Sequence, residues 1–281
     1  MQIFNTINEL QKVLAGWRES QQTIGFVATM GGLHLGHLSL IKLAKNQADR
    51  VLVSIFVNPT QFAADEDFES YPRTLAADLE QLKKLGVDGI FTPTIEQIYP
   101  QGKGFERNQF GEKKYLFEIL CGKTRPHFFF GVLQVVKRLF EIIKPDVAIF
   151  GQKDYQQLQI IKQFSSNIEI ISAEILREKN GLAMSTRNQY LSPDERKIAG
   201  KLYEILSQLA DGKLQITSAK VALKQHFSLD YLEILDANSL EKISPKTSKI
   251  AILSAVFLGK TRLIDNIITE QKFENLGEKN V

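Results

Sequence analysis

The sequence is poor in the residues that build covalent or metal-bound scaffolds. Only one of its 281 residues is a cysteine, Cys121, and only four are histidines. A single cysteine excludes an intramolecular disulfide and a metal site built from cysteines. The formal net charge of +3 is too small to indicate binding to nucleic acid or to an acidic membrane surface. Long apolar runs are also missing, so the sequence predicts neither a secretion signal nor a membrane span, and we expect a cytoplasmic protein.

The composition is otherwise that of an ordinary globular protein, with 43% hydrophobic and 24% charged residues. A chain of this length can form one large domain or two medium ones, each with a real core. Apolar runs typical of buried strands lie at residues 23–28, 51–57, 89–92, 147–150 and 168–171. Helical patterns lie between or before them at residues 6–20, 38–44, 73–84, 132–143 and 156–164. This alternation predicts βαβ units and a right-handed parallel sheet.

The pattern changes after Arg177. Helices are predicted at residues 193–209 and 218–227, followed by consecutive strands at residues 229–235, 249–257 and 262–268. Helices followed by a run of strands are typical of a small α+β domain. The expected fold is therefore α/β, a Rossmann-like parallel sheet at residues 1–176 with a smaller C-terminal α+β domain at residues 177–281.

The densest chemical signal lies at the first strand-to-helix turn. Gly31, Gly32 and Gly36 stand there with two histidines, His34 and His37, three residues apart. This spacing places both imidazoles on one side of the helix start, where free backbone N–H groups and the helix dipole favour an anion. We expect the glycines to let a phosphate approach and the imidazoles to stabilise its charge. The alternative is an ordinary turn with two surface histidines.

Two further turns follow predicted strands and are expected at the same edge of the sheet, where α/β proteins bind ligands. Lys153 can reach a phosphate as a point charge, and Asp154 can cap a helix or bind a ribose hydroxyl. Gln61 and Gln157 offer amide donors and acceptors that suit a substrate with one carboxylate and hydroxyl groups. The alternatives are a solvated turn and ordinary surface glutamines.

The loop at residues 181–188 has two interpretations. It contains Ser185, Thr186 and Arg187, whose hydroxyls and guanidinium suit a phosphate clamp. The same loop also suits the capping of the helix predicted from Pro193.

Acidic residues raise the question of a metal site. Asp65, Glu66, Asp67 and Glu69 crowd one loop, which we interpret as a solvated charge run. Magnesium usually takes only one or two protein carboxylates in addition to nucleotide phosphates. Asp78, on a predicted helix, is therefore an equally open candidate.

The turn with His34, Gly36 and His37 resembles the His-x-Gly-His signature of the nucleotidylyltransferase superfamily, whose members bind ATP there and attack its α-phosphate. Six motifs in order resemble the pantothenate synthetase (pantoate–β-alanine ligase) family across nearly the whole chain. They are Thr29-Met30-Gly31 with the histidine pair, Val53–Pro59 with Gln61-Phe62, Tyr71–Thr74, Gly151 with Lys153–Gln157, Gly181–Ser185 with Arg187-Asn188, and Thr261–Asn266.

This resemblance implies an enzyme that condenses (R)-pantoate with β-alanine through pantoyl adenylate, converting ATP to AMP and pyrophosphate. It also implies Mg²⁺ as cofactor, with Asp78 at a metal-associated position, and a homodimer formed through the N-terminal domain. By resemblance His37, the proton donor, acts in catalysis with His34 and Lys153, and Gln61 and Gln157 bind pantoate, with Gln61 also binding β-alanine. The implied ATP-binding residues are Met30, Gly31, Gly32, Leu33, His34, Leu35, Gly36, His37, Gly151, Gln152, Lys153, Asp154, Leu176, Met184, Ser185, Thr186 and Arg187.

The sequence departs from the family pattern at several positions. Ala28 replaces a usual proline, Thr60 a usual methionine and Thr186 a usual serine, and Ala77 leaves Asp78 alone from a frequently acidic pair. The largest departure is the segment 125–131, Arg-Pro-His-Phe-Phe-Phe-Gly, where the family tends to read Arg-Pro-Gly-His-Phe-Arg-Gly. The aromatic run at residues 127–130 is open to three interpretations, as part of the core, a lid or a partner surface, and we expect the core.

Two other functions compete with this interpretation. Another nucleotidylyltransferase would use the histidine pair to join a nucleotide to a phosphorylated substrate and would need several basic groups to bind it. A non-catalytic nucleotide sensor would bind ATP without releasing pyrophosphate. The amides of Gln61 and Gln157 favour a substrate with one carboxylate and hydroxyl groups.

Overall fold

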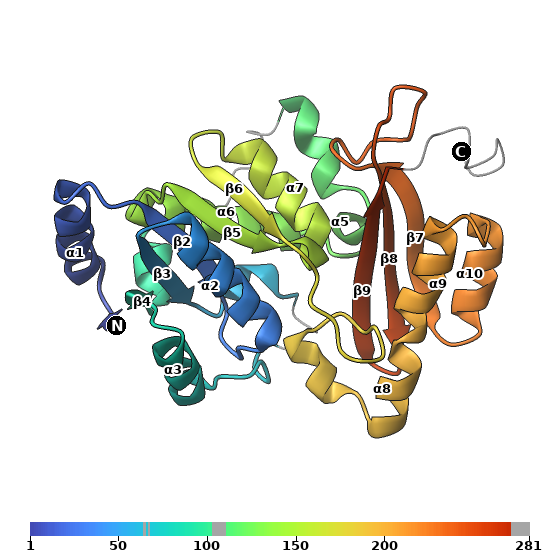
Figure 1. Cartoon of the computed structure of the whole chain (residues 1–281), viewed down its shortest axis with the longest axis horizontal. Helices are drawn as coiled ribbons and strands as arrows, with labels where there is room; N and C mark the ends of the chain where they lie inside the picture. The colour runs from blue at the N-terminus through green and yellow to red at the C-terminus, as the bar shows by residue number, and fades with distance from the viewer. Residues whose placement is uncertain (64–65, 67, 103–110, 271–281) are drawn as a thin grey trace. The chain divides into compact units, whose positions relative to one another are not determined.

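The structure is a computed structural model of the whole chain and describes residues 1–63, 66, 68–102 and 111–270 (Figure 1). Its contacts divide the chain into two compact units. The first comprises Met1–Gln152 and Ile160–Glu174, and the second comprises Lys153–Gln159 and Ile175–Val281. The short segment from Lys153 to Gln159 therefore groups with the second unit, although along the chain it lies between two strands of the first.

The first unit contains a six-stranded sheet in which every pair of neighbouring strands is parallel. Its order is β1-β4-β3-β2-β5-β6. The strands are β1 (Gln2–Phe4), β2 (Ile24–Thr29), β3 (Arg50–Ile55), β4 (Gly89–Phe91), β5 (Val147–Gly151) and β6 (Glu169–Ala173). The expected α/β parallel sheet is confirmed. The edge strand β1 was not expected, because three residues are too few to show a strand pattern.

The strand order reverses between β2 and β5, which lie side by side. From β2 the chain adds strands toward β4, and from β5 it adds β6 on the other side. Because all strands are parallel, the carboxyl ends of β2, β3 and β5 share one edge, as the sequence predicted. Such a reversal leaves a crevice at that edge, where open α/β sheets bind ligands.

Helices cover both faces of this sheet, as side-chain alternation along β2 requires. Val27 packs with Ile41 and Ala44 of α2 (Leu35–Gln47). The preceding residue, Phe26, points to the opposite face of the sheet. Its ring meets the ring of Phe140 edge-on, with 6.2 Å between the two centroids. The remaining helices of this unit include α1 (Ile7–Glu19), α3 (Leu75–Lys84), α4 (Ile95–Ile98), α5 (Cys121–Thr124) and α6 (Phe128–Ile143), with the 3₁₀ turns η1 (Pro59–Gln61) and η3 (Gly111–Phe117).

The aromatic run before Gly131 opens α6, which begins four residues earlier than predicted. Phe129 is buried, so the expected core position is confirmed for this ring. Phe128 lies under the Arg125 guanidinium, 3.8 Å from the ring centroid. Phe130 stacks on Phe117 at 4.6 Å between centroids, so the position where the family has arginine holds an aromatic contact.

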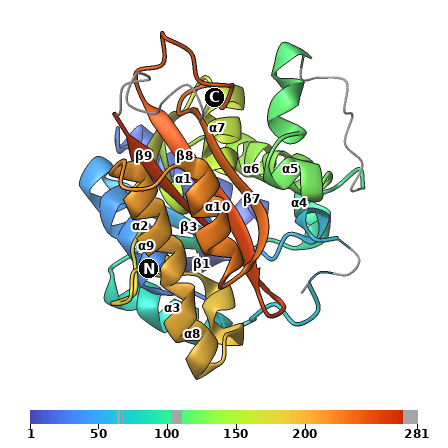
Figure 2. The same ribbon diagram turned by 90° about the vertical axis from the view of Figure 1, so that its right-hand side faces the viewer.

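The second unit is built on a three-stranded antiparallel sheet of β7 (Ser228–Asp236), β8 (Ile250–Leu258) and β9 (Thr261–Thr269). Figure 2 shows α9 (Lys201–Ala210) and α10 (Ile216–Lys224) side by side across one face of this sheet. The predicted single helix at 193–209 is wrong, because α8 (Pro193–Ala199) ends before α9 begins. Gly200 separates them, and a side chain there would collide with the carbonyl oxygen of Asn180.

The second unit also contains the beginning of α7 (Tyr155–Phe164). The Tyr155 hydroxyl donates to the carbonyl oxygen of Ala237 at 2.8 Å, which ties this turn to the loop after β7. Over the described part of the chain, no helix has the length and apolarity needed to cross a membrane.

Phe26 tests the packing of the first unit. Phe26→Ala should lower the free energy of unfolding by about 3–5 kcal/mol, because it leaves a cavity between β2 and α6. The single tryptophan, Trp17, lies on α1 in this unit, so its fluorescence reports urea unfolding there. As a control, Leu75→Ala truncates a side chain that is 45% exposed and should change the free energy by less than about 0.5 kcal/mol. Equal losses in the two variants would contradict the packing described.

Candidate functional site

The two histidines predicted at the end of β2 lie together at the start of α2. His34 is the N-cap residue of this helix, and His37 lies in its first turn. Their ring centroids are 4.1 Å apart and the ring planes are inclined by 40°. The predicted arrangement of two imidazoles on one side of the helix start is confirmed.

Backbone contacts determine which nitrogen each ring uses as acceptor and which as donor. Nδ1 of His34 accepts the N–H of Gly36 at 3.1 Å, and Nδ1 of His37 accepts the N–H of His34 at 3.4 Å. A neutral imidazole that accepts at Nδ1 carries its proton on Nε2. Each ring is therefore oriented by the backbone and donates through Nε2–H, which suits contact with a phosphate oxygen.

The turn before the histidines is held by a buried carboxylate. Asp78, in the first turn of α3, is 1% exposed. Its oxygens accept the backbone N–H of Gly32 at 3.0 Å and of Leu33 at 2.9 Å. The Thr74 hydroxyl donates to the same carboxylate at 3.3 Å. The backbone N–H groups of this turn thus bind a carboxylate of the protein itself.

The expectation of free backbone N–H groups is therefore wrong for five amides of this turn. Besides the two amides bound by Asp78 and the two bound by the imidazoles, the N–H of Gly31 donates to the Thr29 hydroxyl at 3.3 Å. Buried amides need such partners, and here side chains supply them. A phosphate at this turn would meet imidazole donors before backbone donors.

Two of the glycines serve this arrangement. Gly31 and Gly32 have φ angles of +82° and +60°, in the region that side chains rarely adopt. A Cβ atom on Gly31 would lie 3.1 Å from Oδ2 of Asp78 and 3.2 Å from Ile55. The close approach that glycine permits here is that of the Asp78 carboxylate.

The residues present do not fit a metal ion at Asp78. Its carboxylate is buried and already accepts backbone and hydroxyl hydrogen bonds. Across the described residues, no group of three or more His, Cys, Asp and Glu side chains is placed to hold a metal ion, so a site built from protein ligands alone is not formed there. Of the acidic loop, Asp65 and Asp67 lie outside the described residues. Asp78 therefore supports the turn through hydrogen bonds.

Gln61, which follows β3, is oriented by a polar cluster. Its Nε2 lies 2.8 Å from the sulfur of Met30, and its Oε1 accepts from Nδ2 of Asn58 at 3.2 Å. Oδ1 of Asn58 in turn accepts from the hydroxyls of Tyr99 at 2.5 Å and Thr60 at 3.0 Å. Burial raises the pKa of Tyr99 to about 12, so this hydroxyl stays protonated at neutral pH. The sequence motif contains Asn58 but gave no sign that Tyr99 supports it.

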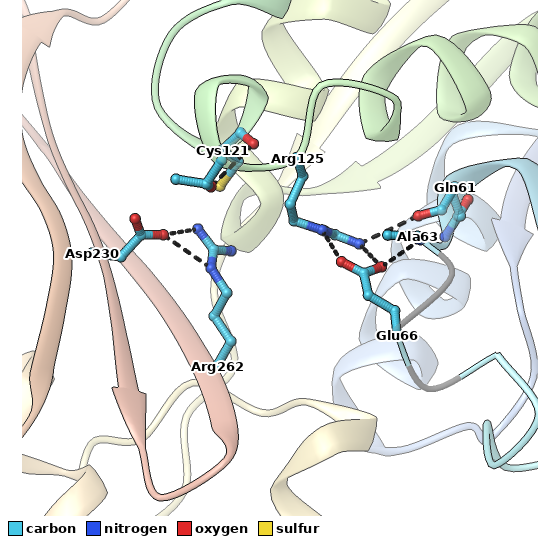
Figure 3. A network of polar contacts seen from close by, with 8 residues as sticks. Gln61, Ala63, Glu66, Cys121, Arg125, Asp230 and Arg262 are labelled. Carbon is cyan, nitrogen blue, oxygen red and sulfur yellow. Dashed lines mark hydrogen bonds and ion pairs between the residues drawn. The ribbon is translucent and has the colours of Figure 1, made fainter.

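A second contact restrains the backbone of Gln61. The Arg125 guanidinium binds the Glu66 carboxylate through two nitrogens, each 2.5 Å from an oxygen, and donates to the carbonyl oxygen of Gln61 at 3.3 Å (Figure 3). One member of the acidic loop is thus in a half-buried ion pair with side chains 18% and 23% exposed. The interpretation of the loop as a solvated charge run is wrong for Glu66.

Predicted nucleotide-binding residues of the second unit also lie together. The N–H of Met184 donates to the carbonyl oxygen of Leu176 at 2.9 Å, within a hairpin that Arg177 and Ala183 bridge. Ser185 then caps the short 3₁₀ helix η5 (Thr186–Tyr190) and accepts the N–H of Arg187 at 3.3 Å. The loop thus caps η5, whereas Ser192 caps α8 with Glu195.

The second strand-to-helix turn carries its predicted pair. Nζ of Lys153 lies 3.8 Å from Oδ1 of Asp154, in a long ion pair with side chains 20% and 46% exposed. Gln157 lies half-buried in the first turn of α7. The remaining predicted residues of this turn, Gly151 and Gln152, are also half-buried.

Comparison with known families agrees with these motifs. The family model described as pantoate-beta-alanine ligase matches residues 2–268. The chain belongs to the pantoate-beta-alanine ligase family. The chain is therefore a ligase.

Individual relatives cover nearly the whole chain. It is 56% identical over 281 residues to a pantothenate synthetase of Ruthia magnifica subsp. Calyptogena magnifica, covering 95% of this chain and 99% of the relative. It is 43% identical over 286 residues to the pantothenate synthetase of Caldicellulosiruptor bescii, and this match covers 97% of this chain and 100% of the relative.

Solved structures show the same fold. The pantothenate synthetase of Thermus thermophilus matches with a TM-score of 0.84 at 36% identity, covering 95% of this chain and 99% of that one. A second match is the pantoate-beta-alanine ligase of Francisella tularensis, complexed with beta-gamma ATP and beta-alanine. Its TM-score is 0.80 at 38% identity, and the match covers 96% of this chain and 98% of that one.

Asp78→Asn distinguishes a positioning carboxylate from a metal ligand. Asparagine keeps the size but turns one acceptor into an NH₂ group that faces a backbone N–H. The turn that carries the histidines should then shift, and a misplaced catalytic group lowers the rate by up to about 100-fold. We therefore expect kcat of this ligase to fall about 10- to 100-fold. The Mg²⁺ concentration that gives half-maximal activity should stay unchanged.

The matched control is Thr74→Val, which removes one hydrogen bond to the same carboxylate. It should lower kcat by about fivefold, the effect of one hydrogen bond. A rise in the Mg²⁺ requirement of Asp78→Asn without a loss of kcat at saturating Mg²⁺ would contradict the positioning role.

Proposed function

We propose that this chain condenses (R)-pantoate with β-alanine to give pantothenate, with ATP converted to AMP and pyrophosphate through a pantoyl adenylate. In the first step an oxygen of the pantoate carboxylate attacks the α-phosphorus of ATP, and the bond to the β-phosphate oxygen breaks. In the second step the amine of β-alanine attacks the acyl carbon, AMP leaves, and the nitrogen loses a proton. The oriented imidazole pair of His34 and His37, in a chain of this ligase family, carries the proposal.

The first step needs donors where negative charge develops on phosphate oxygens. His34 and His37 supply Nε2–H groups whose rings are already oriented, so little reorganisation is needed during the reaction. Lys153 adds a mobile positive charge near the leaving pyrophosphate. These three residues are the proposed catalytic residues.

The proposed ATP site has two parts. Met30–His37 form its first part, with Gly31 and Gly32 shaping the turn. The second part consists of Gly151, Gln152, Lys153, Asp154, Leu176, Met184, Ser185, Thr186 and Arg187. Mg²⁺ is proposed to enter with ATP, held by its phosphates, because Asp78 does not fit as its ligand.

Pantoate is proposed to bind through the amides of Gln61 and Gln157, with Gln61 also contacting β-alanine. An amide can donate to a carboxylate and accept from a hydroxyl, which matches pantoate. The polar cluster of Asn58, Thr60 and Tyr99 holds Gln61 ready, so less rotamer freedom is lost when the substrate binds. The proposal further includes a cytoplasmic location and a homodimer formed through the N-terminal domain, whose mass light scattering would measure.

Pyrophosphate release tests the function directly. Purified protein is given ATP, Mg²⁺ and pantoate, first without and then with β-alanine. We expect pantothenate and sustained AMP formation only when β-alanine is present. Binding of ATP without pyrophosphate under any combination would leave a nucleotide sensor. Pyrophosphate release with a phosphorylated alcohol instead would indicate another nucleotidylyltransferase.

His37→Ala should lower the rate of pyrophosphate release at least about 100-fold, the usual contribution of a positioned acid–base or oxyanion-binding group. The matched control is His226→Ala, which removes an exposed histidine of the second unit. It should leave the rate within about twofold, as surface substitutions usually do. Similar rates in both variants would remove His37 from the proposed catalytic residues.

Gln61→Ala should raise the KM for pantoate by about tenfold or more, because two hydrogen bonds to the substrate are lost. Tyr99→Phe removes only the hydroxyl that supports Asn58 and should raise the same KM by about two- to fivefold. Steady-state kinetics at saturating ATP measures both effects. An unchanged pantoate KM in Gln61→Ala would contradict the proposed pantoate site.

A further inference from the structure

The motif Thr261–Asn266 on β9 matches the family pattern but has no part in the reaction described above. Two of its residues are polar and almost completely buried, Asp265 at 3% exposure and Asn266 at 2%. Buried polar groups lower stability unless partners satisfy them. Their partners therefore indicate what these residues do.

Asp265 binds Arg177 through both carboxylate oxygens. Nη1 and Nη2 of the guanidinium lie 2.6 and 2.9 Å from Oδ2 and Oδ1. Burial raises the pKa of Asp265, and the hydrogen bonds and charge of Arg177 act against that rise. Arg177 also donates to the carbonyl oxygen of Gly181 at 3.0 Å and lies 3.6 Å from the ring centroid of Tyr203.

These contacts hold the hairpin that carries two proposed ATP-binding residues. Arg177 lies between Leu176, which bonds to Met184, and Glu178, whose N–H donates to the carbonyl oxygen of Leu182 at 2.8 Å. Gly181 turns the hairpin with φ +90°, and a Cβ atom there would lie 2.7 Å from the Tyr203 ring. The guanidinium thus links the hairpin turn to β9.

Asn266 holds the other nucleotide segment of the same unit. Its Nδ2 donates to the carbonyl oxygen of Lys153 at 3.0 Å, and its own N–H donates to Oδ1 of Asp265 at 2.7 Å. Two consecutive residues of β9 therefore contact the Lys153 turn directly and the Leu176–Met184 hairpin through Arg177. The two segments lie far apart in the sequence but share this one anchor.

We propose that Asp265 and Asn266 are positioning residues that fix the Lys153 turn and the Leu176–Met184 hairpin in the relative placement that ATP requires. This inference rests on the proposed function. Neither residue touches a reacting atom in it. Asn266 controls where the Lys153 main chain lies and so where its ammonium group can reach. Asp265 controls the hairpin by keeping Arg177 in one orientation.

The test uses Asn266→Ala and Asn266→Asp in the full chain. Alanine removes the donor to Lys153 and should raise the KM for ATP and lower the rate of pyrophosphate release about fivefold each, the effect of one hydrogen bond. Aspartate keeps the size but directs an acceptor at the Lys153 carbonyl oxygen, so its effect should exceed that of alanine. The KM for β-alanine should change less than about twofold in both variants, because neither changes a residue proposed to contact β-alanine.

Ser254→Ala is the matched control, because Ser254 is fully buried in the same sheet and its hydroxyl donates to the carbonyl oxygen of Tyr231 at 3.0 Å. This hydrogen bond touches neither nucleotide segment. The variant should have the wild-type KM for ATP even where its melting temperature falls. Arg177→Lys keeps the charge but loses the two-point contact with Asp265 and should raise the KM for ATP as well.

The outcomes separate the two proposals. Wild-type protein that releases no pyrophosphate from ATP and pantoate would overturn the proposed function, and this inference with it. Active wild-type protein with an unchanged KM for ATP in both Asn266 variants would overturn the positioning role alone. An equal rise in the KM for ATP in Ser254→Ala would also overturn it, because the effect would then be one of general stability.

Discussion

A buried carboxylate in α3 holds the turn after β2 through the backbone N–H groups of Gly32 and Leu33. Because Asp78 satisfies these donors, the turn can leave the sheet, reverse and enter α2 with His34 as N-cap. Both imidazoles then accept backbone N–H groups at Nδ1, which makes Nε2–H the donor of each ring. The orientation of the proposed catalytic pair thus depends on an acidic residue from a different helix.

Buried polar residues also orient the other side chains that are proposed to contact ligands. Gln61 is held by Asn58, which is held by the buried hydroxyl of Tyr99. Arg177 is held by Asp265 before it fixes the hairpin turn. In each case a buried polar residue is satisfied inside the protein and orients a residue nearer to the proposed ligand. Such support reduces the conformational entropy that is lost when a substrate binds.

The departures from the family pattern fit this organisation. Thr60, where methionine is usual, contributes a hydroxyl to the cluster around Asn58. Phe130, where arginine is usual, stacks on Phe117 and adds apolar packing in place of a charge. Ala77 leaves Asp78 as the single acid of this pair, and its hydrogen bonds account for that acid without a metal. These substitutions change hydrogen bonding and packing next to residues of the proposed site.

Local sequence patterns are enough to predict the parallel sheet, most of its helices, and the turns that carry His34, Lys153 and Ser185, because periodicity, glycines and caps act over a few residues. Which groups satisfy the buried polar atoms depends instead on contacts between distant elements. The Gly32–Asp78 contact spans 46 positions and the Arg177–Asp265 contact spans 88. The break at Gly200 and the grouping of residues 153–159 with the second unit likewise depend on distant neighbours. No local pattern encodes such contacts, since they exist only once separate elements have packed together.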